Sequence, residues 1–358
     1  MPDPTPRIVA VADQFRAELL AEERAAASRM VRAYGGVWGR LSPRLDAITQ
    51  AIEAKRAAGE EVHPDWLRRQ ERYTELLRQT AAELVRFASF ADLTIQDSQQ
   101  RAVNAALAQA QELVGQGLPP GLGFRDLAQI GIEWNRLPAE ALTDLVGTLG
   151  NGSPLRTLLD AIPGGVTARV SDALINGVAQ GWGPRKAADV VRSETGMGLS
   201  RALRIARTEV LRSYRTATRR QYQANPDLVR GWRRHAAKNA RTCLACLVLD
   251  GKSYRIDEDM DDHVMGRCAL VPETISHADL GLPVTSPPLD WERGQQWFER
   301  QPEVVQAEMM GPELFDAWQS GRVTLDRIPK LIKDKDWGNA WVVNSLKDLL
   351  GKQDQEAA

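Results

Sequence analysis

The sequence predicts a mainly α protein whose second half contains a small α+β domain. Three observations lead to this prediction. The first third of the chain is rich in Ala, Leu, Glu, Arg and Gln, with apolar residues at helical spacing. A basic helical stretch is followed by a compact segment that holds all three cysteines of the chain. The last fifth of the chain is aromatic-rich and contains half of the ten tryptophans.

The composition is that of a soluble globular protein. The chain has 358 residues, of which 43% are hydrophobic and 26% are charged, and this length suits two or three domains with separate cores. No apolar run approaches the roughly 20 residues of a membrane span. The N-terminus does not resemble a secretion signal. We therefore expect a soluble protein that is made inside a cell and has no membrane partner.

Changes in composition divide the chain into four parts. A Gly/Pro-rich link around Pro119 and Pro120 separates the helical first part from the next domain. The expected parts are a disordered arm at residues 1–6, a long-helix region at 7–118, a domain at 119–275 and a Trp-rich C-terminal extension at 276–358.

The long-helix region is expected to contain several helices that pack together. Breaks between them are expected at the glycine pair Gly35 and Gly36, at Gly59, and near Leu93. Its strongest pattern alternates by four and three positions, as in a coiled-coil seam, through Trp66, Gln70, Tyr73, Leu77, Thr80, Leu84 and Phe87. Such a seam can face other helices of the chain or other subunits.

A basic helix is expected to follow in the third part of the chain. Pro184 should begin one helix that ends at Gly196 and Gly198, and Ser200 should cap the next. The second helix has an apolar stripe through Leu203, Ala206, Val210, Tyr214 and Ala217. Four arginines fall off this stripe and are predicted to point to solvent or a partner, namely Arg204, Arg212, Arg215 and Arg219.

The charge of the chain is unevenly distributed. The net charge is −1, but residues 201–241 carry 11 arginines and one lysine against only two acidic residues. Such a block can bind phosphates of a nucleic acid or an acidic protein surface. A solvated helix face without a partner explains the block equally well.

The cysteines and one histidine have the spacing of a metal site. Cys243, Cys246, His263 and Cys268 form the pattern C-x2-C-x16-H-x4-C. Four Cys and His ligands with a C-x2-C pair are typical of structural Zn²⁺. Two alternatives remain, namely cysteines buried as packing residues and a redox-active pair. The redox pair should open a helix, whereas the residues around Asp250 and Gly251 favour a hairpin turn.

Two short strands are expected around these ligands. One spans residues 228–236 and includes Trp232, and a second extended segment at 247–254 should turn at Asp250 and Gly251. Two short strands bury little area. A metal that joins the C-x2-C pair to His263 and Cys268 would supply the missing stability.

The same region resembles the phage head morphogenesis domain, found in minor head proteins similar to phage Mu protein F and the SPP1 minor head protein. The matching residues are Ile205, Ala206, Arg207, Thr208, Glu209, Trp232, Arg241, Thr242, Cys243, Cys246, Leu249, Asp250, Gly251, His263, Arg267, Cys268 and Pro272. The resemblance places the core of this domain at residues 174–272. Where the family often has His-Pro-x-Cys-Arg-Cys, this chain has Val264 and Gly266 in place of the proline and the first cysteine.

The resemblance implies roles for several of these residues. It implies that Arg207, Thr208 and Glu209 form a structural motif, in which Arg207 and Glu209 would act as a polar lock between the basic helix and the cysteine segment. Asp250 and Gly251 belong to the same structural motif. The tail, with Trp297, Phe298 and Trp318 among its residues, is similar to the extension of some minor head proteins, and can be a small helical core or a set of partner anchors.

The function implied is assembly rather than catalysis. A minor head protein would act in procapsid assembly at the portal vertex, bind portal protein and major capsid or scaffold protein, and possess no small-molecule substrate. It would be located inside the capsid, and in the host cytoplasm during assembly. Its basic helix could touch packaged phage DNA without sequence preference.

Two enzymatic functions are the alternatives. One is an HNH-like metal-dependent nuclease, which the Asp262 and His263 pair suggests; only His277 follows as a further histidine, without the expected pattern. The other is an ADP-ribosyltransferase fused to the head domain, for which the tail lacks a Ser-Thr-Ser and Glu-x-Glu pair. Neither alternative accounts for the cysteine spacing as well as a structural zinc site does.

Overall fold

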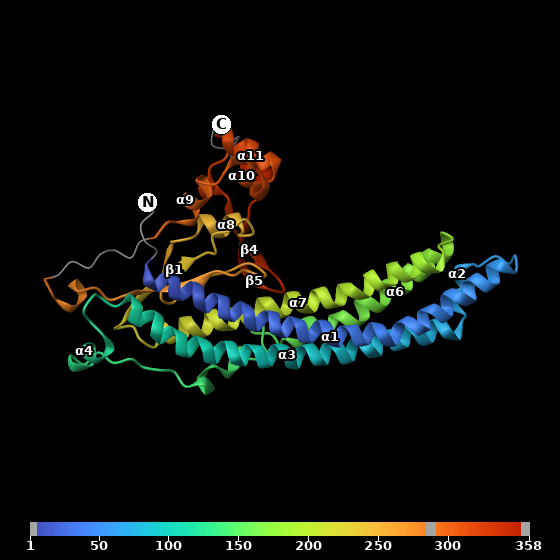
Figure 1. Cartoon of the computed structure of the whole chain (residues 1–358), viewed down its shortest axis with the longest axis horizontal. Helices are drawn as coiled ribbons and strands as arrows, with labels where there is room; N and C mark the ends of the chain where they lie inside the picture. The colour runs from blue at the N-terminus through green and yellow to red at the C-terminus, as the bar shows by residue number, and fades with distance from the viewer. Residues whose placement is uncertain (1–5, 284–290, 352–358) are drawn as a thin grey trace. The chain divides into compact units, whose positions relative to one another are not determined.

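The structure is a computed structural model that describes residues 6–283 and 291–351. The mainly α class is confirmed (Figure 1). The elements in chain order are α1 (Arg7–Ala57), α2 (Pro64–Arg68), α3 (Glu71–Gly117), α4 (Phe124–Gln129), the 3-10 helix η1 (Ala139–Leu145), α5 (Arg156–Leu159), α6 (Ala161–Ala179), α7 (Pro184–Gln223), β1 (Val229–His235), α8 (Leu244–Val248), β2 (Ser253–Arg255), β3 (Ala269–Thr274), η2 (Ala278–Leu280), α9 (Gly294–Glu299), α10 (Glu303–Met310), α11 (Pro312–Gln319), η3 (Leu325–Arg327), β4 (Pro329–Asp334), β5 (Gly338–Val343) and α12 (Leu346–Gly351).

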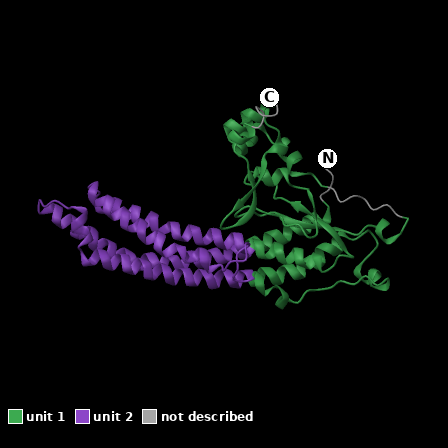
Figure 2. Cartoon of the chain, turned by 180° about the vertical axis from the view of Figure 1, so that it is seen from behind, with its two compact units in different colours: residues 1–20, 100–145, 211–358 green, residues 21–99, 146–210 purple. Residues whose placement is uncertain are grey.

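The chain forms two compact units, coloured green and purple in Figure 2. Unit 1 contains residues 1–20, 100–145 and 211–358, and unit 2 contains residues 21–99 and 146–210. Of the residues expected to form a loose arm, 1–5 lie outside those described. The predicted boundaries at residues 118/119 and 275/276 stay predictions. None of the described helices has both the length and the apolar character needed to span a membrane.

Unit 2 consists of helical segments that run side by side (Figure 2). The rings of Tyr34 on α1 and Phe87 on α3 meet edge to face at 4.8 Å, and the hydroxyl of Tyr34 donates to the carbonyl of Thr195 on α7. Arg40 on α1 pairs with the buried carboxylate of Glu83 on α3 at 2.8 Å. The predicted packing of long helices on each other is therefore what unit 2 shows.

Two predicted helix breaks are wrong. Gly35 and Gly36 lie inside α1 and Leu93 lies inside α3. The packing of the long helices on their neighbours offsets the roughly 1 kcal/mol cost of each interior glycine. The break at Gly59 is confirmed, since α1 ends at Ala57 and Gly59 has φ +74°.

The predicted end of a helix at Gly196 and Gly198 is also wrong, because α7 runs through both. A Cβ at Gly198 would lie 3.0 Å from Ile162 Cγ2 on α6, so this glycine allows α6 and α7 to approach closely. Ser200 is not a helix cap; its hydroxyl donates to the carbonyl of Gly196 one turn earlier, at 3.3 Å.

Unit 1 is built on a three-stranded antiparallel sheet with the order β2-β1-β3. The strand predicted at residues 228–236 is confirmed as β1, but the extended segment predicted at 247–254 is wrong: residues 244–248 form α8 and only 253–255 form β2. Trp232 on β1 stacks on Tyr254 on β2 with ring centroids 4.2 Å apart. A cluster of buried apolar residues, called the sheet core, packs around the sheet. It includes Val114, Tyr222, Leu228, Trp232, Cys246, Tyr254, Met260, Cys268 and Leu270.

The Trp-rich tail also belongs to unit 1 and forms a core of its own. This tail core contains Leu244 and Leu247 of α8, Phe298, Leu314, Ala317, Ile328 and Leu349, with Trp297 and Trp318 packed against it. Of the two interpretations of the tail, the small core is therefore the one that the structure supports. The expected helices α9 to α12 are present, but β4 and β5 form an additional antiparallel hairpin that was not predicted.

Candidate metal centre

The C-x2-C pair lies at the start of α8. Cys243 is the residue before the first turn of this helix, and Cys246 lies within it. A tight turn of this kind places both sulfur atoms on one side of the backbone. Cys246 is 2% exposed, whereas Cys243 is half-buried. The pair therefore does open a helix, contrary to the hairpin expected around it, although this helix has only five residues.

The other two predicted ligands lie on the loop that leads into β3. His263 is half-buried on this loop, and buried Cys268 directly precedes the first residue of β3. Two non-glycine residues of the loop adopt left-handed backbone conformations, Asp261 at φ 48° and Met265 at φ 63°. Such conformations are rare for side chains other than glycine and have to be held by surrounding contacts.

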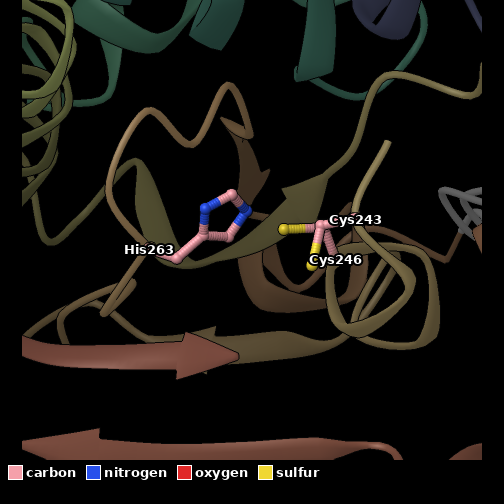
Figure 3. A group of neighbouring side chains, drawn as sticks. All are labelled: Cys243, Cys246 and His263. Carbon is pink, nitrogen blue, oxygen red and sulfur yellow. The ribbon is translucent and has the colours of Figure 1, made fainter. Parts of the chain in front are cut away.

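The loop and the start of α8 bring the ligand atoms together. Among the described residues, Cys243, Cys246 and His263 form one group whose ligand atoms all lie within 4.8 Å of one another, and Figure 3 shows the His263 ring beside the two sulfur atoms. Cys246, Asp262 and Cys268 form a second such group. Because Cys246 belongs to both groups, the four predicted ligands occupy one cluster.

The donor set of this cluster fits Zn²⁺. Thiolate sulfur and imidazole nitrogen are the usual ligands of structural zinc, whereas Ca²⁺ and Mg²⁺ prefer oxygen. Asp262 is the one oxygen donor in the cluster. Its carboxylate is already paired with two arginines, as described below, so it is a weaker candidate for a ligand than the three cysteines and His263.

The protonation of the cluster follows from shared hydrogen bonds. A hydrogen bond from Cys246, opposed by burial and supported by His263, lowers the pKa of the Cys243 thiol to about 4. Cys246 also lowers the pKa of Cys268 to about 7, while its own pKa lies well above the usual value. Burial would lower the pKa of His263, but Cys243 and Asp262 raise it to about 9. A metal would therefore have to displace protons from His263 and Cys246.

A buried ion triad of Arg234, Asp262 and Arg215 borders the cluster. Arg234 Nη2 donates to Asp262 Oδ1 at 2.6 Å, and Arg215 Nη1 lies 3.1 Å from Asp262 Oδ2. The prediction that Arg215 points to solvent or a partner is wrong, because only 10% of its side chain is exposed and it pairs with Asp262 of the same chain. Sequence reasoning missed Arg234, although it lies two positions after Trp232 and so shares that residue's buried face of β1.

The other predicted contact arginines differ in exposure. Arg204 is exposed on α7 as predicted. Arg212 donates to the carbonyl of Trp337 at 2.9 Å, and Arg219 pairs with Asp259 at 2.6 Å. Within unit 1, the tail thus holds Arg212 and the loop that contains Asp259 holds Arg219. Much of the basic block at residues 201–241 therefore has partners within the fold, and a role of these arginines in binding DNA or protein stays a prediction.

The predicted structural motif lies in two places. Arg207 pairs with Glu23 on α1 at 3.0 Å within unit 2, where Thr208 and Glu209 are buried. The ion pair found for Arg207 thus fixes α7 to α1.

Asp250, only 2% exposed, accepts from the backbone N–H of Ala236 at 2.7 Å and pairs with Lys238 at 3.0 Å. Gly251, at φ 78°, donates its N–H to the carbonyl of Arg234 at 2.8 Å.

A known protein family matches the part of the chain that contains the cluster. Residues 168–288 match the family model described as phage Mu protein F like protein. The matched segment contains α7, all three strands of the sheet and the whole cysteine and histidine cluster. No curated protein and no solved structure matches the chain.

Proposed function

Since residues 168–288 match the family model described as phage Mu protein F like protein, we propose that the chain is a minor head protein of a phage that acts in head morphogenesis. The family match carries the proposal, because it covers the sheet and the cluster rather than an isolated motif. In more detail, we propose that the chain acts during procapsid assembly and is located at the portal vertex inside the capsid. Before assembly it would be in the host cytoplasm. Portal protein and major capsid or scaffold protein are the proposed partners.

In this proposal the cysteine and histidine cluster has a structural role. Cys243, Cys246, His263 and Cys268 would hold one Zn²⁺ that joins α8 to the loop before β3. The two groups that share Cys246, each with its ligand atoms within 4.8 Å of one another, support this assignment. A zinc ion with four protein ligands has no open position for a substrate, so it would stabilise the fold and catalyse no reaction. This role suits the three short strands, which bury little area between them.

A contact with packaged DNA is a further part of the proposal. Arg201 and Arg204 are exposed on α7, whereas several later arginines of the basic block are paired with carboxylates. Contacts of arginine with phosphate would be indifferent to sequence and sensitive to salt. The nuclease alternative gains no support from His277, the histidine that follows His263 in the sequence, because His277 is only 6% exposed.

The proposal is tested in the phage that encodes the chain. A nonsense mutation early in the gene should reduce the yield of filled heads, and the chain supplied from a plasmid should restore it. Purified particles should contain the chain at a few copies each, measured by quantitative mass spectrometry. The proposal would be overturned by normal heads in the mutant together with absence of the chain from wild-type procapsids and virions.

A further inference from the structure

The buried ion triad of Arg234, Asp262 and Arg215 contains an unbalanced charge. The exposed fractions of the side chains are 0% for Arg234, 1% for Asp262 and 10% for Arg215. Two guanidinium groups face one carboxylate, which leaves one positive charge in excess in a region shielded from water. Buried charges are costly unless they are compensated nearby, so the triad requires one further negative charge close to it.

The cysteine and histidine cluster provides that charge when it holds a metal. Three thiolates, one neutral imidazole and Zn²⁺ together carry a single negative charge. Arg234 lies close enough to reach it, because its Nη2 is 3.6 Å from the sulfur of Cys246. The filled site and the triad would therefore be neutral as a whole.

The triad also fixes the loop that carries two of the ligands. Arg234 Nη1 donates to the carbonyl of Met260 at 3.1 Å, and Arg215 Nη1 donates to the carbonyl of Gly266 at 3.0 Å. Between these two points, Asp262 Oδ1 accepts from the backbone N–H of His263 at 3.2 Å. The same carboxylate oxygen lies 3.7 Å from Cys246 Sγ. The loop is thus held at its start, middle and end beside the ligands.

Gly266 shows how closely the loop surrounds the carboxylate. A Cβ at this position would lie 2.2 Å from Asp262 Oδ2, closer than any real contact allows. Asp261 and Met265 have left-handed backbone conformations on either side of His263. The backbone of the loop at Gly266 therefore packs directly against the Asp262 carboxylate.

We propose that Asp262, held between Arg234 and Arg215, is the positioning residue of the metal centre, and that the excess positive charge of the triad stabilises the metal-filled Cys3His set. Asp262 fixes the loop so that His263 and Cys268 face Cys243 and Cys246, without itself binding the ion. This inference rests on the zinc site proposed above.

The test measures zinc affinity of the full chain by competition with a chromophoric chelator, and records the visible spectrum of the Co²⁺-substituted protein. Asp262→Asn keeps the shape of the side chain and removes its charge, and we expect the zinc affinity to fall about 10- to 100-fold, the range typical for residues that orient metal ligands. Asp261→Asn is the matched control on the same loop, since asparagine tolerates its left-handed conformation. The control should retain the wild-type affinity and Co²⁺ spectrum.

A second variant separates positioning from charge. Gly266→Ala leaves all three charges in place but pushes the Asp262 carboxylate away, so it should also lower zinc affinity and change the Co²⁺ spectrum. Arg215→Gln removes the excess positive charge together with the hydrogen bond to the carbonyl of Gly266. It should weaken zinc binding, and it replaces Asp262→Asn if that variant loses its helical circular dichroism. If Asp262→Asn keeps the wild-type zinc affinity and Co²⁺ spectrum, the inference is overturned and the zinc site stands. If Arg215→Gln has replaced that variant, wild-type zinc affinity in Arg215→Gln has the same meaning. A wild-type chain that binds no zinc would instead overturn the proposed metal site itself.

Discussion

Arg207 on α7 donates a hydrogen bond of 3.0 Å to the carboxylate of Glu23 on α1, and only 3% of the Glu23 side chain is exposed. The two residues are 184 positions apart in the sequence. Their contact joins the first long helix to the helix that leads into the sheet domain, within unit 2. An arginine in a short sequence motif therefore stabilises the packing of long helices.

Substitution of Arg207 should destabilise unit 2. Arg207→Ala leaves the buried Glu23 carboxylate without this partner, and we expect the free energy of unfolding to fall by about 1–3 kcal/mol, since a third of the Arg207 side chain is exposed to water. The measurement is urea unfolding followed by circular dichroism. The control is Arg204→Ala, three residues earlier on the exposed face of α7, which should change stability by less than about 0.5 kcal/mol. Equal effects of the two substitutions would contradict the assigned role.

Zinc content should depend on the C-x2-C pair. Purified wild-type chain should contain about one zinc per molecule by plasma mass spectrometry, and the Cys243→Ser, Cys246→Ser double variant should contain none. Chelation should lower the thermal midpoint of the wild type and leave that of the variant unchanged. Because protons compete for His263, whose pKa is raised to about 9, zinc binding should weaken progressively as the pH falls below about 9. A zinc-free wild type whose melt equals that of the variant would leave the cysteines as packing residues.

Asp250 should make the stability of unit 1 sensitive to acid. Burial would raise the pKa of Asp250, but His235 and Lys238 outweigh it and hold this pKa below the usual value. A carboxylate whose pKa is lower in the folded state stabilises the fold above the unfolded-state value of about 3.9, and this stabilisation is lost as the pH falls through the folded-state value. Wild type should therefore be more stable than Asp250→Asn by about 1–3 kcal/mol at pH 7, and this difference should shrink towards pH 3.

The measurement for Asp250 is the urea midpoint of each protein at a series of pH values. Asp227→Asn, a substitution at an exposed carboxylate, serves as the control and should follow the wild type throughout. A difference between wild type and Asp250→Asn that stays constant from pH 7 to pH 3 would show that the charge of Asp250 has no part in stability.

Gly294 should be essential for the contact between the tail and α8. A Cβ at Gly294 would lie 2.5 Å from the carbonyl oxygen of Leu247, which is backbone and cannot easily move. We expect Gly294→Ala to destabilise unit 1 by about 1–3 kcal/mol through overpacking. Gly164→Ala inside α6 meets nothing within 4 Å and should instead stabilise its helix by about 0.5–1 kcal/mol. Urea unfolding followed by tryptophan fluorescence and circular dichroism distinguishes these opposite signs.

Binding to DNA should depend on exposed rather than paired arginines. The Arg201→Gln, Arg204→Gln double variant should reduce the slope of log affinity against log salt concentration by about 2, because each phosphate contact contributes about 0.9. Arg220→Gln is the control, since Arg220 is paired with Asp144 at 2.7 Å. Fluorescence anisotropy with duplexes of unrelated sequence is the measurement, and an unchanged slope in the double variant would exclude these two residues as contacts.

Local sequence patterns predicted those elements that depend on local chemistry. The strand around Trp232 and the long helices follow from spacing along a single segment, and the cysteine and histidine spacing identified the residues that the structure brings into one cluster. Periodicity also assigned Arg215 to a helix face. It could not show that Asp262, 47 positions later, would cover that face and bury the arginine.

The errors in the helices have a similar origin. Glycines at positions 35, 36, 196 and 198 favour breaks by local propensity, but packing between distant helices decides the outcome, as the contact of Gly198 with Ile162 shows. The hairpin of β4 and β5 was missed because no residue of β4 is fully buried and the strand shows no apolar alternation. Its partner residues are set by pairing with β5, which no single segment reveals.

The five-residue helix α8 belongs to two cores at once. Its Cys246 lies in the sheet core, while its Leu244 and Leu247 lie in the tail core with Phe298 and Leu314. So short a helix has little stability of its own. A chain that ended before α9 would expose both leucines and weaken the helix that begins at Cys243, so the extension beyond the matched family segment serves as part of the support for the ligand cluster.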